Sequence, residues 1–287
     1  QSAYTSFAGF LKGADQRAVN VFACFDNEEV GSNTKQGAGS TFLKDVLDRI
    51  NDGLGKTAEE LRCAVASSFM VSCDNAHAVH PNHPEKTDEN NCVYLNEGVV
   101  VKSHAGQQYT SDAVSIALWK GICEKAGIPV QFFANRSDMR GGSTLGNIAM
   151  SQVSMNAVDI GLPQLSMHSA YETAGARDCA YMIRAVKAFF AGSVNIRFAG
   201  KKLTVDDADL ALGPYPHVGP EYSYTGGDDA VHSVLFQVTT GVFPHHAYDQ
   251  IGGEELSVVG VAGEIQVCPC RSQFGKFVRL VIQDQDG

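Results

Sequence analysis

The chain has 287 residues, a formal net charge of −10, 44% hydrophobic residues and 19% charged residues. This composition is ordinary for a globular protein that buries a sizeable core. The acidic balance argues against a nucleic-acid partner, which requires clustered lysine and arginine. No stretch approaches 18 uninterrupted apolar residues, so we expect no membrane span.

The eight cysteines mostly lie within apolar runs and form no paired C-x-x-C framework. The segment that begins at Gln1 has no basic region followed by an apolar core, so it shows no signal peptide. The cysteine usage predicts a reducing, cytoplasmic compartment. Cys268-Pro269-Cys270 is an alternative metal-binding spacing, but structural zinc sites normally use four clustered ligands.

Predicted helices and strands alternate along the first two thirds of the chain. We expect helices at 3–12, from about 41 to 50 after a Ser40 cap, at 56–62, at 112–126 after a Ser111 cap and at 171–190, and strands at 18–25, 63–73, 99–102, 130–134 and 157–161. Residues 84–98 are polar and predicted as loop. This order is typical of an α/β fold with an open mixed sheet flanked by helices.

The last third of the chain has a different pattern. Short predicted strands lie between glycine and proline clusters, and no helix is expected; the strands are 194–198, 202–205, 234–238, 256–261, 265–267 and 277–282. We therefore divide the chain into an α/β domain at 1–190 and a smaller β-rich segment at 191–287.

Two adjacent glutamates, Glu28 and Glu29, follow the first buried strand and an Asp26-Asn27 turn. Neighbouring residues of an extended segment point in opposite directions, so one carboxylate can bind a metal while the other takes a proton from the metal-bound water. A solvated strand end is the alternative, because paired carboxylates at strand turns are mostly surface charge.

Asp74 follows the second predicted strand, about one strand-helix-strand unit after Glu29. Ligands of open α/β sheets bind outside the carboxyl ends of the strands, so both carboxylates are expected at one edge. His77, His80 and His83 come next, in a segment that Pro81 and Pro84 keep from being helical. The histidine segment is either a metal neighbourhood or a polar surface loop.

Two further segments are candidate site loops. Paired glycines at Gly141-Gly142 let a backbone approach a ligand, and Ser143 or Thr144 could cap a helix whose free N–H groups hold an anion. A tight turn is the alternative. His168 precedes the last predicted helix, where a lone histidine is more often structural than a ligand.

Taken together, these motifs resemble the aspartyl-aminopeptidase family of zinc peptidases, M18, over about residues 1–190. The resemblance rests on order and spacing, and its motifs are Phe25-Asp26-Asn27-Glu28-Glu29-Val30-Gly31-Ser32, Gln36-Gly37-Ala38, Asp74-Asn75-Ala76-His77-Ala78-Val79-His80-Pro81-Asn82, Glu89-Asn90, Lys102, Tyr109, the Gly-Gly-Ser-Thr-Leu-Gly loop and Gln164-Leu165-Ser166-Met167-His168-Ser169. These residues are similar to the carboxyl-terminal half of the family's catalytic domain.

The resemblance implies a role for each matching position. Glu28 is expected to be the general base, and the expected metal ligands are Glu29, Asp74 and His168. The substrate pocket is expected to include Lys102, Tyr109, His77 and Gly142, with the lysine suited to an acidic side chain. The implied cofactor is a pair of zinc ions, with cobalt or manganese as alternatives.

The implied function is a cytoplasmic, homo-oligomeric metalloaminopeptidase that removes N-terminal Asp or Glu from peptides. The family pattern also requires a His-x-Asp histidine and a bridging aspartate before the Glu-Glu motif, and neither is found in this sequence. The family's inserted oligomerisation domain is not found either, so we expect the chain to be incomplete or rearranged.

Residues of the last third could replace the missing ligands. The candidates are Asp206, Asp207, Asp209, His217, Asp228, Asp229, His232, His245 and His246. Two alternatives to the enzyme remain open. One is a catalytically incomplete relative that acts as a binding or assembly module, and the other is an unrelated β-rich binding domain fused to a peptidase remnant.

Overall fold

The computed structural model describes residues 1–13, 18–192, 194–199, 202–205, 208–211, 233–240, 270–272 and 275–277, with side chains through residue 192. The helices are α1 (Ser2–Lys12), α2 (Phe42–Gly53), α3 (Ala58–Ala66), α4 (Ala113–Lys125), α5 (Leu145–Met150), α6 (Ala176–Ala191) and the 3₁₀ turn η1 (Pro84–Lys86). No helix of this described part is long and apolar enough to cross a membrane.

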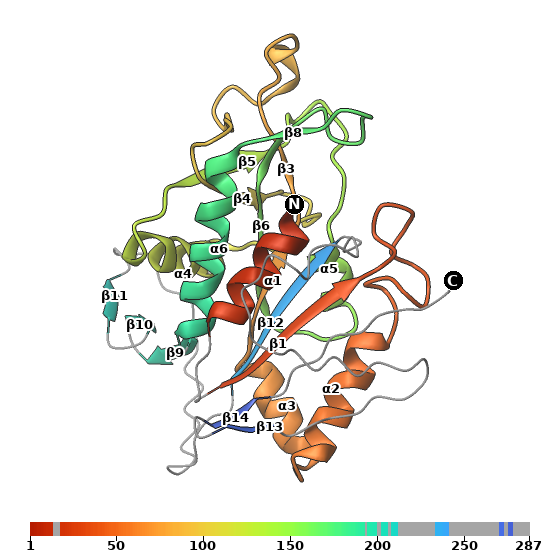
Figure 1. Cartoon of the computed structure of the whole chain (residues 1–287), viewed down its shortest axis with the longest axis vertical. Coiled ribbons are helices and arrows are strands. Elements are labelled where there is room, and N and C mark those ends of the chain that lie inside the picture. The colour runs from red at the N-terminus through yellow and green to blue at the C-terminus, as the bar shows by residue number, and fades with distance from the viewer. Residues whose placement is uncertain are drawn as a thin grey trace.

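A six-stranded sheet forms the centre of the molecule (Figure 1). Its strands, in spatial order, are β1 (Ala18–Phe25), β12 (Ser233–Thr240), β2 (Phe69–Cys73), β6 (Asn156–Gly161), β4 (Val99–Ser103) and β5 (Val130–Ala134). The first four are parallel, and β4 runs antiparallel to β6. The expected mixed α/β sheet is therefore confirmed.

Smaller sheets make up the remaining strands. They are β3 (Ala76–His77) with β7 (Pro163–Leu165) and β8 (Thr173–Ala174), then β9 (Val194–Ala199) with β10 (Lys202–Val205) and β11 (Ala208–Ala211), and β13 (Cys270–Ser272) with β14 (Gly275–Phe277). The first of these sheets follows directly after β2 and β6, so it extends the edge at which those strands end.

Side chains that alternate along the strands supply two apolar layers, one on each face of the sheet. Phe22 of β1 and Val71 of β2 join the layer covered by α1, α4 and α6. Val21 of β1 and Met70 of β2 join the layer covered by α2, α3 and α5. Burial of this kind contributes about 25 cal/mol per Å² of apolar surface, which makes the two layers the main source of stability.

Strand β12 lies between β1 and β2 and pairs in parallel with both (Figure 1). It comes from the segment that was expected to form a separate β-rich unit, yet it occupies a central position of the main sheet. The division at residue 190 stays a prediction, because the described residues after 192 are few.

The sequence expectation was wrong in local detail at several places. Residues 63–66 continue α3 and are not strand; the Thr57–Glu60 capping box marks the start of this helix, and Ser67 is its C-cap. The last helix begins at Ala176 and not at 171, since residues 173–174 pair with β7. The N-cap of α2 is Thr41 and not Ser40, and the N-cap of α4 is Asp112 and not Ser111. Thr144 is the N-cap of α5, but its side chain makes no capping hydrogen bond. The strands expected at 256–261 and 265–267 lie outside the described residues.

Candidate active site

The candidate site lies at the carboxyl ends of β1 and β2, the edge that the sequence predicts. Phe25 and Cys73 are the last residues of the two strands, and β12 separates them. Adjacent strands are about 4.8 Å apart, so the two strand ends are about two such spacings apart. The loops after them carry the acidic residues.

Glu28 and Glu29 belong to the turn that follows β1. The carbonyl of Glu28 accepts a hydrogen bond from the Gly31 N–H at 3.0 Å, and Gly31 has a φ of 116°, which a residue with a side chain rarely adopts. Burial, together with the Asp74 and Glu29 carboxylates, raises the pKa of Glu28 to about 7, while Lys102 and His168 lower it. Glu28 is thus suited to exchange a proton near neutral pH.

Glu29 is in direct contact with His168. The Glu29 Oε2 lies 2.8 Å from the His168 Nε2, and both side chains are more than 60% exposed. His168 has a positive φ of 67°, and its N–H donates to Glu172 Oε1 at 2.7 Å. The loop after β7 is therefore shaped so that its imidazole reaches the carboxylate after β1, and two of the three predicted ligands meet.

Asp74, the third predicted ligand, pairs with Lys102. The Lys102 Nζ lies 3.6 Å from Asp74 Oδ2 and donates to the Asn75 carbonyl at 3.3 Å. Lys102 is only 1% exposed, and its ammonium lies 5.3 Å from the centre of the Tyr109 ring. Buried lysines need such partners, because an unpaired ammonium is costly away from water.

The other predicted pocket residues are Tyr109, His77 and Gly142. Tyr109 is buried, and its hydroxyl accepts a hydrogen bond from the Asn135 Nδ2 at 3.3 Å. The His77 ring lies 6.4 Å from the Phe133 ring, and His80 Nε2 is 3.2 Å from the Ser166 hydroxyl. Gly142 is exposed, and a Cβ placed on it would meet no atom within 4 Å. The roles assigned to these residues stay predictions.

The donor set fits a metal only in part. Carboxylate oxygen and imidazole nitrogen are ordinary zinc ligands, and the Glu29–His168 pair offers one of each at a short distance. Within the described residues, however, no three His, Cys, Asp or Glu side chains gather closely enough to hold an ion. Of the replacement ligands considered, Asp209 lies in β11, and all the others lie outside the described residues, as does Cys268.

Asp159 was not singled out from the sequence, although the structure buries its carboxyl completely beneath the site loops. It accepts hydrogen bonds from the Thr110 N–H at 2.5 Å and the Thr144 hydroxyl at 2.8 Å. A signal was available, because an aspartate inside the apolar run 157–160 is unusual for a buried strand.

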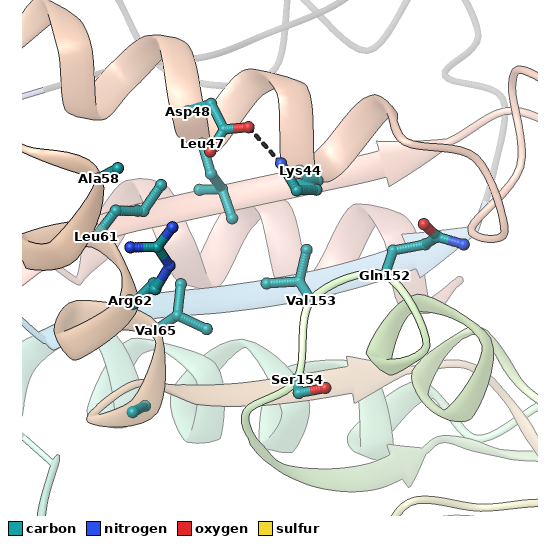
Figure 2. A pocket seen from close by; sticks show the side chains of 11 residues that line it. Lys44, Leu47, Asp48, Ala58, Leu61, Arg62, Val65, Gln152, Val153 and Ser154 are labelled. Carbon is teal, nitrogen blue, oxygen red and sulfur yellow. Dashed lines mark hydrogen bonds and ion pairs between the residues drawn. The ribbon is translucent and has the colours of Figure 1, made fainter.

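A separate pocket lies between α2, α3 and the turn at 152–154 (Figure 2). Leu47, Leu61 and Val153 form its apolar lining, and the Lys44–Asp48 ion pair lies at its rim. It is next to the beginnings of β2 and β6 rather than their ends. None of the predicted site residues lines it, so it plays no part in the candidate active site.

Known proteins resemble this chain over its first two thirds. The family model described as "Aminopeptidase I zinc metalloprotease (M18)" matches residues 1–190. A "Probable M18 family aminopeptidase 2" of Clostridium acetobutylicum is 50% identical over 60% of this chain and 40% of its own length. A "Probable aspartyl aminopeptidase" of Ricinus communis is 42% identical over 67% of this chain and 38% of its own length.

A solved structure, "Structure of S. cerevesiae mApe1 dodecamer", matches with a TM-score of 0.50 and 29% identity, over 58% of this chain and 36% of that one. The chain thus spans about two fifths of the curated relatives it matches.

Proposed function

Because this chain belongs to the M18 family of aminopeptidases, we propose that it acts in metal-dependent removal of N-terminal acidic residues from peptides. The observation that carries the proposal is the position of Glu28, whose pKa is raised to about 7 among Asp74, Glu29, Lys102 and His168. A carboxyl group with that pKa accepts a proton readily near neutral pH and can return it to a leaving amine.

The predicted site residues each have a role in this proposal. Glu28 takes the proton from the attacking water and later gives it to the amine of the departing peptide. The Lys102 ammonium attracts the carboxylate of an N-terminal Asp or Glu, with Tyr109 beside it. Glu29, His168 and Asp74 are the residues that would hold a metal, for which we propose zinc. When bound, such an ion acts as a Lewis acid that polarises the scissile carbonyl and makes water more acidic.

Homo-oligomeric assembly belongs to the same proposal, since the related mApe1 structure is that of a dodecamer. The described residues offer no three-ligand group. We therefore expect the remaining ligands to come from residues outside that part of the chain or from another polypeptide. The predicted cytoplasmic location stays a prediction.

The experiment that tests the function measures zinc per chain and hydrolysis of aspartyl- and glutamyl-p-nitroanilide. We expect bound zinc, hydrolysis of both substrates, and a loss of about 10²–10⁴-fold in kcat for Glu28→Gln at unchanged zinc content. Light scattering in the same buffer reports the oligomeric state.

A catalytically incomplete relative that serves as a binding or assembly module is the second candidate. The absence of a three-ligand group among the described residues is the observation that favours it. Absence of bound zinc together with absence of hydrolysis would reject the peptidase and support this module.

A further inference from the structure

The Asp159 carboxyl connects two loops that are distant in the sequence. Its Oδ2 accepts from the Thr110 N–H at 2.5 Å, in the loop between β4 and α4. Its Oδ1 accepts from the Thr144 hydroxyl at 2.8 Å, in the loop between β5 and α5. Hydrogen bonds to an ionised acceptor are about twice as strong as neutral ones, so this carboxylate can hold both loops at once.

The surroundings of Asp159 admit little movement. Its side chain and that of Thr144 are almost fully buried, and its own N–H donates to the Ser111 hydroxyl at 2.9 Å. A Cβ on Gly146 would lie 2.8 Å from Thr110 Cγ2 and 2.9 Å from Asp159 Oδ1. Only a glycine at this position lets the start of α5 approach the carboxylate so closely.

The first of these loops contacts the Lys102 ammonium through Tyr109, and the second contacts Tyr109 through Asn135. Tyr109, whose ring lies beside that ammonium, immediately precedes Thr110. The Asn135 amide donates to the Tyr109 hydroxyl and also packs against Gly141, where a Cβ would lie only 2.4 Å from Asn135 Nδ2. The loops therefore meet at two places, Asp159 and Asn135, and a shift of the second loop acts on Lys102 through Tyr109.

We propose that Asp159 is a positioning residue that holds the Tyr109 loop and the Gly141–Thr144 loop together around Lys102. By fixing the space beside the ammonium, it sets the preference of the site for an acidic N-terminal side chain. The specificity part rests on the proposed peptidase function. The positioning part does not.

Backbone amide exchange tests the positioning part on the full chain, without substrate or metal. Asp159→Asn keeps the size of the side chain but replaces one acceptor with a donor, and Thr144→Val removes the hydroxyl at constant shape. We expect exchange of the Thr110 amide and of residues 141–147 to become about tenfold faster in both variants. Thr144→Ser, which keeps the hydroxyl, should retain the original protection, as should α6 in all three variants.

The specificity part is tested by the ratio of kcat/KM for aspartyl- over alanyl-p-nitroanilide. We expect this ratio to fall about tenfold in Asp159→Asn and Thr144→Val, through KM for the aspartyl substrate, and to stay unchanged in Thr144→Ser.

Unchanged exchange at Thr110 would overturn the positioning role. Faster exchange with an unchanged ratio would overturn the specificity role. If the unsubstituted chain hydrolyses neither substrate, the peptidase function fails, whereas the exchange result still decides whether Asp159 holds the loops.

Discussion

Glu28 combines two properties at the residue scale, namely partial burial and proximity to two other carboxylates. Its pKa of about 7 in the folded chain compares with 4.5 for the free side chain, so the native state retains a proton that the unfolded state releases between these pH values. The stability of the metal-free chain should therefore fall as pH rises through this window, and the penalty should be complete above pH 7.

Glu28→Gln removes that penalty. We expect the substituted chain to match the original in Tm near pH 4, to exceed it increasingly up to about pH 7, and to keep a constant advantage at pH 8, with both chains measured in a chelating buffer. Glu124→Gln, which changes a surface carboxyl of α4, is the control for charge alone. A Tm difference that stays constant with pH would contradict the raised pKa.

Two glycines of the same loop region differ in their surroundings. A Cβ on Gly146 would lie 2.8 Å from Ser72 Cβ, whereas one on Gly142 would meet open space. We expect Gly146→Ala to lower the free energy of unfolding by about 1–3 kcal/mol, since the close contact forces neighbours to move. Gly142→Ala should change it by no more than about 0.5 kcal/mol. Urea unfolding of the two variants makes the comparison, and equal losses would refute it.

The long helix α6 is the main packing element on one face of the sheet. Phe189 is 1% exposed and contacts the rings of Phe69, Trp119 and Phe190. Phe189→Ala should lower the free energy of unfolding by about 3–5 kcal/mol, because it deletes buried apolar atoms and leaves a cavity. Phe189→Leu keeps most of the volume and should cost less than about 1.5 kcal/mol. A similar cost for the two variants in chemical unfolding would show that the site can collapse around the gap.

The sequence predicted elements well where one local signal decides them. β1 begins and ends where its apolar run does, at Ala18 and Phe25. The prediction was wrong at residues 63–66, where the apolar run suits a strand and a helix equally and α3 continues to Ala66. An apolar run alone does not show where a helix ends and the next strand begins.

Contacts within the site were harder to foresee. The sequence predicted that Glu29 and Asp74 lie at one edge of the sheet, because both follow strand ends, whereas only the family resemblance suggested that His168 joins them as a ligand. It did not predict that Glu29 pairs with His168 while Asp74 pairs with Lys102, since these contacts depend on loop backbones such as the positive φ of His168. The sequence also did not predict that β12 lies between β1 and β2, because strand order depends on tertiary packing.

For the whole molecule, the register of β12 makes a direct prediction. Residue 239 is the partner of Cys24 on β1 and of Cys73 on β2. Adjacent strands lie about 4.8 Å apart, which is within the Cα separations that disulfides span. We therefore expect Thr239→Cys to form a disulfide with Cys24 or Cys73 under mild oxidation, identified by mass spectrometry of peptides.

Val238→Cys is the matched control, because the register partners of residue 238 are Ala23 and Ser72, which carry no thiol. Equal cross-linking of the two variants to Cys24 and Cys73, or none in either, would place β12 elsewhere.

The same strand has a consequence for synthesis on the ribosome. Chains emerge from the amino terminus, so β1 and β2 leave the exit tunnel long before residues 233–240, which pair with both. Until then, the edges of β1 and β2 that later pair with β12 have unpaired backbone N–H and C=O groups. Pairing between strands so far apart in the sequence is slow. This delay favours misassembly between neighbouring nascent chains on one mRNA. The facing edges of β1 and β2 therefore stay open to aggregation until β12, in the carboxyl-terminal third, has been synthesised and has paired with both.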